Sequence, residues 1–362
     1  MTSEDVALAA AAYRIPTNAP EADGTLAWDS TTMVVATASC GGSVGTGWTF
    51  APAAAVAVVE ELLAPVVAED RDPLDVEATW EAMVRQVRNA GRPGLVGMAL
   101  SAVDIALWDL RGRVEGRALA DLWDATPVPV EAYGSGGFTT YDEDRLTTQL
   151  GGWRDLGLRD VKIKIAESWG HEEQRDLERA ATARKVVGDD IGVFVDANGG
   201  YSVTQACGVG RRLDELGVAW FEEPVSSDDL TGLDEVRVSV RADVAAGEYG
   251  YDEASLARMA PYVDCLQLDV TRCGGYTGWR RAVAACPPGT ELSAHCAPYL
   301  SLPVAATTPG LRHVEWFHDH VRIAQLLVDG CPDPTDAHLA PQVAPGHGLT
   351  FRTAGAEAFR VT

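Results

Sequence analysis

The sequence of 362 residues lacks any apolar run long enough to span a bilayer. It also lacks cysteine pairs of the CxxC type, because its seven cysteines are scattered along the chain. Cys265, Cys286 and Cys296 lie in or beside apolar or strand-like segments, so we expect core thiols rather than disulfides. No GxGxxG motif follows a predicted strand, and this absence weakens the case for a dinucleotide-binding protein.

Positive charge is scarce, since 29 lysines and arginines stand against 53 aspartates and glutamates and give a formal net charge of -24. This balance argues against binding to nucleic acid and to anionic membrane surfaces. It also disfavours long-range steering of an anionic substrate, so an acid substrate would need a local positive centre such as a metal ion. Glu4 and Asp5 stand where a secretory signal carries positive residues, so we expect a cytoplasmic protein.

The first third of the chain predicts a small α+β unit that starts with strands and continues with helices. An apolar, β-branched run at residues 33–38 and a segment rich in Gly, Ser and Thr at residues 41–49 predict an antiparallel hairpin. Helical patterns follow at about residues 53–67, 76–87 and 95–114. The apolar face of the last one carries Met98, Ala102, Ile105 and Trp108. We expect Asp104 and Asp109 to lie off that face.

Beyond Pro127 and Pro129 the chain changes to a repeated rhythm of strand, loop and helix. The eight predicted strands span residues 128–133, 160–165, 191–195, 219–221, 243–246, 265–270, 291–294 and 312–314. Eight such steps favour an α/β fold of the TIM-barrel type over an open sheet. We therefore predict an α+β capping domain at residues 1–126, a catalytic barrel at 127–330, and a C-terminal segment at 331–362 that packs back on the capping domain.

Three carboxylates end three consecutive predicted strands: Asp196, Glu222 and Glu248. Neighbouring strands lie about 4.8 Å apart, and the carboxyl ends of barrel strands face one rim, so these acids can converge on one point. Three carboxylates sharing a site need a compensating charge, and Mg²⁺ fits a set of oxygen ligands while leaving positions open for substrate and water. Each acid alone is better explained as a cap of the following helix. Three in register favour the metal site.

Two lysines, Lys162 and Lys164, lie two residues apart on one predicted strand, so both point to the same side. Helices would cover the isoleucines on the other side, so we expect the lysines to point into the barrel. Buried cations that lie close to each other and to a metal have depressed pKa values, which would let a lysine act as a base. Lys164, nearer the carboxyl end, is the better candidate.

Across the predicted ring, His295 ends the seventh strand and Asp269 ends the sixth. Asp269 could hold the imidazole by its second nitrogen. A lone His-Asp pair is usually structural, but opposite a lysine it becomes a second acid-base group. Glu315 ends the eighth strand between apolar residues, so we expect it to keep its proton and to donate a hydrogen bond to a developing enolate oxygen.

Three further residues are candidates for substrate binding. Asn198 lies just beyond the first of the three acids and on the same side, where it could bond a substrate hydroxyl. Ser135, in a glycine-rich loop, is a weaker candidate for the same role. His318 belongs to a His-Asp-His segment at residues 318–320 that needs no function as a solvated loop, but loops on this rim do bind ligands.

Together these residues resemble those of the enolase superfamily, and the chain is similar to its mandelate racemase subgroup. The resemblance covers nearly the whole chain and rests on motifs that are weak alone but highly specific together. They are the Lys-x-Lys, Asp-x-Asn, Glu-Glu-Pro, Gly-Glu and Ser-Ala-His strands and two longer segments at residues 101–109 and 269–279.

The resemblance implies a capping domain over a modified (β/α)₇β barrel. It implies a Mg²⁺ ion that holds the substrate carboxylate while a base removes the α-proton, giving an enediolate. In this pattern Asp196, Glu222 and Glu248 bind the metal, and Lys164 and the His295-Asp269 pair are acid-base groups on opposite faces. A glutamate at position 248 together with the His-Asp pair favours mandelate racemase-like members over muconate-cycloisomerase-like ones.

Two acid-base groups permit two outcomes for a small carboxylate substrate. Loss of a β-hydroxyl gives a 2-keto-3-deoxy acid, and most assigned activities in the resembling subgroup are such dehydrations of acid sugars. Reprotonation on the far side gives a racemase or epimerase of 2-hydroxy acids, the second candidate. A barrel kept as a scaffold would not need the full set of groups. We also expect the protein to form a homo-oligomer, because barrels of this kind often do.

Specificity should come from capping-domain loops at residues 15–28 and 46–52. Trp28, Trp48 and Phe50 in these loops fit either a partly apolar lid or packing between the domains. The pattern of residue types leaves both explanations open.

Overall fold

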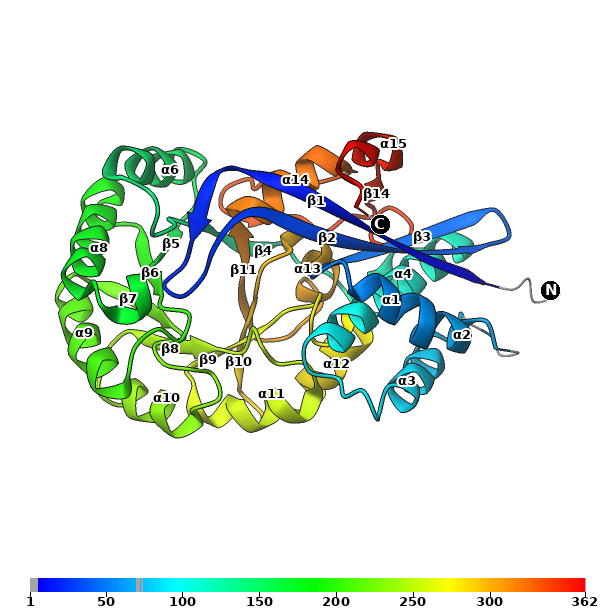
Figure 1. Cartoon of the computed structure of the whole chain (residues 1–362), viewed down its shortest axis with the longest axis horizontal. Helices are drawn as coiled ribbons and strands as arrows, with labels where there is room; N and C mark the ends of the chain where they lie inside the picture. Colours follow the sequence, from blue (N-terminus) through cyan, green and yellow to red (C-terminus); the bar gives the residue numbers. More distant parts are fainter. Residues whose placement is uncertain (1–5, 70–71, 73, 362) are drawn as a thin grey trace.

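The computed structural model describes residues 6–69, 72 and 74–361. Its larger part is a closed barrel of eight parallel strands, β4 to β11 in chain order, in which β11 pairs with β4 (Figure 1). The strands are β4 (Val130–Gly136), β5 (Asp160–Lys164), β6 (Gly192–Asp196), β7 (Val218–Glu222), β8 (Asp243–Ala246), β9 (Cys265–Leu268), β10 (Glu291–Ala294) and β11 (Leu311–Phe317). Each overlaps its predicted range, so the predicted barrel is confirmed.

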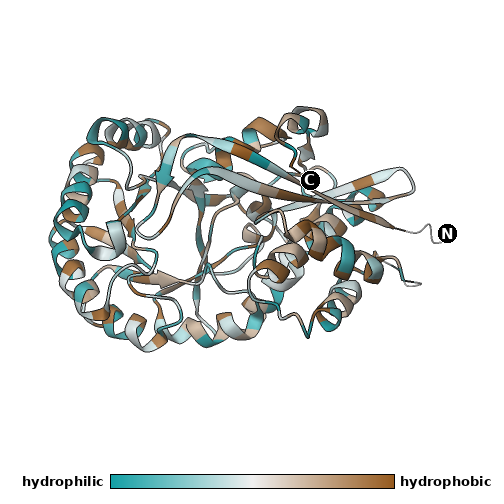
Figure 2. Cartoon of the chain, viewed as in Figure 1, coloured by the Kyte–Doolittle hydropathy of each residue, from teal (hydrophilic) through white to brown (hydrophobic). Residues whose placement is uncertain are grey.

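A helix follows each of the first seven barrel strands, which gives the (β/α)₇β order. These helices are α6 (Glu143–Asp155), α8 (Glu173–Val187), α9 (Val203–Glu215), α10 (Leu230–Arg237), α11 (Glu253–Met259), α12 (Gly275–Ala285) and α13 (Pro298–Ala305), with a short α7 (Glu167–Gly170) before α8, a 3-10 turn at Ala260–Tyr262 after α11, and α14 (His318–Leu327) after β11. Their outer faces carry the hydrophilic residues (Figure 2). In α9, Ala206, Val209 and Leu213 are buried at helical spacing, and Ser202 and Gln205 form a capping box at its start.

The N-terminal part is an antiparallel sheet of β1 (Ala7–Ala22), β2 (Ala27–Cys40) and β3 (Ser43–Phe50), with helices packed on it. The helices are α1 (Ala55–Val58), a π-helical segment Val59–Leu63, α2 (Ala64–Val67), α3 (Val76–Gln86), α4 (Leu95–Glu115) and α5 (Leu119–Leu122). A Cβ atom at Gly45 or Gly47 would lie 2.3 Å from a carbonyl oxygen of α4, so these glycines let β3 lie directly on the helix. The predicted hairpin and helices are confirmed.

The prediction of a loop at residues 15–28 was wrong, because β1 and β2 continue through most of it as a long hairpin that runs across the barrel (Figure 1). Tyr13 and Ile15 are buried and Arg14 between them is exposed, the alternation of a strand with one covered face. Pro16 and Pro20 obscured this pattern. Prolines are tolerated here because β1 is an edge strand whose register shifts between Pro16 and Glu21.

Asp104 and Asp109, which we expected to lie off the apolar face of α4, are both fully buried. Helix α4 packs against β2, β3, α3 and α12, so little of its surface reaches water. Asp104 accepts a hydrogen bond from the backbone N–H of Thr277 at 3.0 Å. Asp109 accepts a hydrogen bond from the Thr46 N–H and forms an ion pair with Arg113, both at 2.9 Å. The two acids tie α4 to α12 and to β3.

The C-terminal segment contacts both parts of the chain. Strand β12 (Val328–Asp329) pairs with β14 (Thr350–Phe351), and β13 (His338–Leu339) pairs with β4 of the barrel. After α15 (Thr353–Ala356) and a 3-10 turn at Glu357–Phe359, the backbone of Val361 bonds that of Ala12 in β1 at 2.9 Å. The segment thus packs against the capping sheet, and the three predicted domain boundaries stay predictions.

All seven cysteines lie within the described residues, and no disulfide joins any two of them there. Cys265 and Cys296 are buried and Cys286 is half-buried, as expected for thiols in or near the core. No helix in the described part of the chain is long and apolar enough to cross a membrane.

The buried Asp104 predicts a pH dependence of stability. Burial raises the pKa of its carboxyl group to about 7 from its ordinary value of 3.8. Between these values the folded state holds a proton that the unfolded state has lost, so stability falls as pH rises and then levels off above pH 7. In Asp104→Asn this contribution is absent. Relative to the wild type, the variant should therefore gain about 2 kcal/mol in free energy of unfolding between pH 5 and pH 8. Urea melts at both pH values measure this gain, and a constant difference between the proteins would contradict the assignment.

Candidate active site

The three predicted metal ligands come together at the carboxyl ends of β6, β7 and β8. Asp196 and Glu222 pair in register on neighbouring strands, and Glu248 follows β8 directly after Gly247. One carboxylate oxygen from each of Asp196, Glu222 and Glu248 lies within 4.8 Å of the other two, and all three side chains are buried. The register of the barrel strands therefore brings together three acids that are distant in sequence.

Crowding of these acids shifts their pKa values. Burial and the neighbouring Asp196 raise the pKa of Glu222 to about 8, despite the opposing effect of Lys162. Burial also favours the neutral form of Glu248, but the charges of His295 and Arg272 outweigh it and hold the pKa of Glu248 below its usual range. A site that concentrates carboxylates in this way favours a bound cation.

The residues present fit a Mg²⁺ ion. Three hard oxygen donors close to one another match the preference of this cation for carboxylates, and Glu248 of the trio lines a cavity that leaves room for substrate and water. Asp196, Glu222 and Glu248 would hold the ion. Glu223, next to Glu222, is buried as well but does not belong to this trio.

The two lysines of β5 point into the barrel, as predicted. Lys162 is fully buried beneath the carboxylates, and its ammonium lies 2.5 Å from Glu222 and 2.8 Å from Glu315. Lys164, nearer the cavity, forms an ion pair with Asp196. Burial lowers the pKa of both lysines, but the facing carboxylates outweigh burial and raise the pKa of each. The expected depression of these pKa values depends on a metal beside the lysines and stays a prediction.

The His-Asp pair forms as predicted. Asp269 Oδ2 lies 2.9 Å from His295 Nδ1, and the second ring nitrogen, Nε2, lies 3.1 Å from Glu248. Burial lowers the pKa of His295, but the Cys296 thiol, Glu248 and Glu315 outweigh it, so the pKa of this imidazole stands well above its usual value. Burial favours the neutral form of Asp269, but its hydrogen bond with His295 and the charge of Arg272 outweigh burial and lower the pKa of Asp269.

The strand order places Lys164 and His295 on opposite flanks. In the closed ring, β11 stands across from β7, which carries the middle carboxylate of the trio. The line between these two strands separates β5, with Lys164, from β10, with His295. A substrate held at the carboxylate trio would therefore have an amine on one side and an imidazole on the other.

Glu315 lies at the centre of this arrangement, but its expected protonation is wrong. Its carboxylate accepts hydrogen bonds from the Ser135 hydroxyl at 2.6 Å and from the Cys296 N–H at 2.8 Å, besides its ion pair with Lys162. Burial favours its neutral form, but Lys162 and His295 outweigh that effect and lower the pKa of Glu315. A carboxylate in this state accepts hydrogen bonds, so it would need a proton from the reaction before donating one.

A cavity of about 550 Å³ opens above the trio, between the barrel rim and the capping sheet. Among the predicted substrate-binding residues, Asn198 lines it. Ser135 is fully buried and points to Glu315 instead, and His318 is not among the lining residues, whereas its neighbour His320 is. These predicted roles stay predictions. The structure places Ser135 below the cavity and His320 in its wall.

Sequence reasoning left open whether the capping-domain aromatics form a lid or pack between domains. Trp28 and Phe50 line the cavity, whereas Trp48 is buried against His347 at a ring-centroid distance of 6.0 Å. Arg14 and Arg272 also line the cavity and were missed. Arg14 could have been found from the alternation of buried and exposed residues along β1. Arg272 could have been found from its position three residues beyond Asp269.

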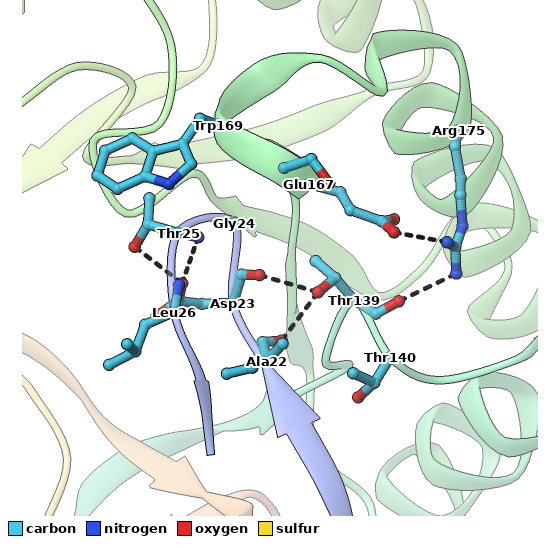
Figure 3. Close-up of a pocket in the computed structure, with 12 residues that line it drawn as sticks. Ala22, Asp23, Gly24, Thr25, Leu26, Thr139, Thr140, Glu167, Trp169 and Arg175 are labelled. Atoms are coloured by element: carbon cyan, nitrogen blue, oxygen red, sulfur yellow. Dashed lines mark hydrogen bonds and ion pairs between the residues drawn. The ribbon is translucent and has the colours of Figure 1, made fainter.

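The tip of the β1–β2 hairpin is anchored on the barrel rim next to this cavity. The Thr139 hydroxyl donates to the carbonyl of Asp23 at 2.8 Å, and the Trp169 N–H donates to the carbonyl of Gly24 at 2.9 Å. Figure 3 shows the tip lying between these two rim segments, over a smaller cavity of about 380 Å³. Asp23 and Leu26 line both cavities. The hairpin therefore closes one side of the central cavity.

Two family models match the chain. Residues 145–355 match the model described as Enolase C-terminal domain-like. Residues 15–123 match the model of the Mandelate racemase / muconate lactonizing enzyme, N-terminal domain.

Curated relatives and solved structures agree with these matches. D-galactarolactone cycloisomerase of Agrobacterium fabrum is 35% identical over 246 residues, or 65% of this chain and 63% of that protein. Arabinonate dehydratase of Saccharolobus solfataricus is 30% identical over 241 residues, or 65% of this chain and 64% of that protein. The chain thus spans slightly under two-thirds of the length of these relatives.

Two solved structures extend over nearly the whole chain. A mandelate racemase/muconate lactonizing enzyme-like protein from Rubrobacter xylanophilus has a TM-score of 0.94 and 43% identity, covering 99% of each chain. A racemase from Streptomyces coelicolor A3(2), solved with bound magnesium, has a TM-score of 0.90 and 26% identity, covering 98% of this chain and 100% of that one.

We predict that the metal-free protein binds one Mg²⁺ per chain at the carboxylate trio. Asp196→Asn removes one charged ligand, so Mg²⁺ affinity measured by isothermal titration calorimetry should fall by about 100-fold or more. Glu223→Gln is the matched control, because Glu223 is an equally buried neighbour outside the trio. Its affinity should stay within about threefold of the wild type. Equal losses in both variants would show that general charge, and not this trio, holds the ion.

Proposed function

The chain belongs to the enolase superfamily, in its mandelate racemase/muconate lactonizing enzyme family, and on that premise we propose that it removes the proton α to the carboxylate of a sugar acid with the help of Mg²⁺. We propose further that the resulting enediolate loses a β-hydroxyl group, so that the overall reaction is dehydration to a 2-keto-3-deoxy acid. Cytoplasmic location and a homo-oligomeric state remain parts of this proposal.

One observation carries the proposal: an amine and an imidazole lie on opposite flanks of three convergent carboxylates. Lys164 stands on β5 and His295 on β10, and the carboxylate trio lies between them in the ring. When bound, Mg²⁺ would supply the positive charge that holds the substrate carboxylate, offsets the charge developing on it, and weakens the hold of Asp196 on the Lys164 ammonium. Such a site suits removal of a weakly acidic carbon-bound proton.

The side chains have separate tasks in this proposal. Lys164 or His295, whichever faces the α-hydrogen, takes the proton as the C–H bond breaks. The electron pair then forms the double bond to the β-carbon while the β-C–O bond breaks, and His295 gives a proton to the departing hydroxyl, which leaves as water. The enol product tautomerises to the keto acid. Lys162 and Glu315 hold charge beneath the reacting carboxylate, and Asp269 keeps the imidazole oriented.

The comparisons support a sugar acid as substrate and leave its identity open. Arabinonate dehydratase acts on a sugar acid by name, and D-galactarolactone cycloisomerase acts on a sugar-acid lactone by name. The cavity has polar and charged walls, with Asn198 and Arg14 beside the apolar Trp28 and Phe50. This lining suits a small polyhydroxylated acid. The chain covers only part of these relatives, so their substrates serve as a guide to class.

Racemisation or epimerisation of a 2-hydroxy acid is the second candidate. The opposed positions of Lys164 and His295 favour it, because one group can take the proton and the other return it on the far face. The similar structure from Streptomyces coelicolor is named a racemase. The two reactions share their first step and part only at the fate of the intermediate.

Incubation with Mg²⁺ and a panel of mono- and diacid sugars in D₂O separates the two candidates. We expect a keto acid from at least one panel member, detected by NMR and by semicarbazide. Deuterium at the α-carbon with inversion and no keto acid would instead establish the racemase. If no acid in the panel gives either product, that result would contradict α-proton abstraction from a sugar acid.

Substitution of the acid-base groups tests their roles. Lys164→Ala and His295→Asn should each lower turnover by about 1,000-fold or more, because each removes a proton-transfer group. Both variants should still bind Mg²⁺, since neither residue belongs to the carboxylate trio. Calorimetry and the keto-acid assay measure the two properties side by side. Near-normal turnover in either variant would show that the role given to that residue is wrong.

A further inference from the structure

We infer that His320 binds the substrate, donating a hydrogen bond from Nε2 of a neutral imidazole to a hydroxyl oxygen of the sugar acid. The inference rests on the proposed function for its substrate class. His320 lies near the start of α14, is buried, and lines the central cavity with His295 and Cys296. The reaction described above gives it no task.

The partner of Nδ1 decides which ring nitrogen carries the proton. The backbone N–H of Ala297 donates to His320 Nδ1 at 3.2 Å, so Nδ1 is an acceptor and the proton of the neutral ring stands on Nε2. Cys296 and Ala297 have φ values of 48° and 41°, left-handed conformations that turn their N–H groups toward Glu315 and His320. In the described part of the chain no hydrogen bond involves Nε2, so this N–H is left for a ligand in the cavity.

Two aromatic rings fix the plane of the imidazole. The Phe50 ring stacks on His320 with a centroid distance of 3.5 Å and an angle of 9°, and the Phe317 ring meets it edge-on at 5.0 Å and 89°. Phe50 belongs to the capping sheet and Phe317 to the barrel, so the ring is held between the two domains. The direction of Nε2–H is therefore set before a ligand binds.

The surroundings keep the imidazole uncharged. Burial lowers the pKa of His320 to about 4 from its ordinary value of 6.5. Asp319 is the nearest acid on the same helix, but its carboxylate already accepts hydrogen bonds from Thr31 and Arg322. The other charged groups that act on the ring are Asp269, Glu315 and His295. A donor without charge suits a hydroxyl oxygen, whereas a carboxylate would favour a cation.

The position of His320 points to a hydroxyl on the flank of the proposed general acid. The loop that orients it follows His295 directly, and the same loop orients Glu315. A hydroxyl held here lies on the side where the proposed elimination releases water. His320 would thus select sugar acids that carry a hydroxyl at this point of the chain over acids that lack one.

NMR tests the protonation state without turnover. In Mg²⁺-loaded protein labelled with ¹⁵N-histidine, long-range ¹H–¹⁵N spectra should show His320 as the neutral Nε2–H tautomer from pH 5.5 to pH 8, with its signals assigned by their loss in His320→Asn. An Nδ1–H tautomer or an imidazolium in this range would overturn the inference. This result stands apart from the proposed function, because it needs no substrate.

Ligand titrations in the same spectra test hydroxyl recognition. Gluconate and galactarate are paired with hexanoate and adipate, acids of equal carbon number without hydroxyls. We expect at least one hydroxy acid to shift the His320 Nε2–H proton signal and its deoxy partner to leave that signal in place. Equal shifts within both pairs, or no shift with either hydroxy acid, would contradict the inference.

Kinetics with a substrate found in the D₂O panel complete the test. His320→Asn keeps an acceptor for the Ala297 N–H but withdraws the donor, so KM should rise roughly three- to tenfold with kcat within about twofold. His320→Gln reaches the Nε2 position and should recover most of the loss. His171→Asn, at an exposed histidine, is the control. Unchanged KM in His320→Asn, or equal losses in the Asn and Gln variants, would overturn the role.

Absence of any substrate in the panel would count against the proposed function and leave the two NMR tests to decide for His320.

Discussion

The concentration of ionisable groups inside a closed barrel is the constraint on which the site depends. Asp196, Glu222, Glu248 and Glu315 are all buried at one end of the barrel, and none of them could stay charged there alone. Lys162 joins Glu222 to Glu315 across the ring, and the pairing raises the pKa of the lysine while it lowers that of Glu315. The opposite charges in this cluster thus compensate one another, and the carboxylate trio is the part of it with the most acidic side chains.

The surrounding elements place these charged groups close to one another. Parallel strands in register bring Lys164, Asp196 and Glu222 into one row, although more than fifty residues separate the first from the last. The left-handed residues after β10 turn two N–H groups toward Glu315 and His320. The capping sheet closes the open side with the hairpin tip, which Thr139 and Trp169 anchor on the rim.

Strand ends and their charged residues could be predicted from the sequence, because the period of two is local and a barrel places the carboxyl ends of all its strands at one rim. The residues of the trio, the lysine pair and the His-Asp pair follow from them. The protonation states could not be predicted in the same way, because they depend on ion pairs between residues on different strands. The sequence indicated that Glu315 would be neutral among apolar neighbours, but Lys162 comes from a distant strand and reverses this. The same limit hid Arg14, whose strand is interrupted by prolines, and His320, whose tautomer depends on a backbone N–H from another loop.

The central claim is that Asp196, Glu222 and Glu248 hold one divalent ion between Lys164 and His295. A crystal grown with Mn²⁺ in place of Mg²⁺ tests it directly, since the anomalous signal of manganese locates the ion without reference to any assumed ligand. We expect a single peak per chain bounded by these three carboxylates, with the amine and the imidazole on opposite sides of it. A peak elsewhere, or a trio whose side chains turn away from the ion, would contradict it.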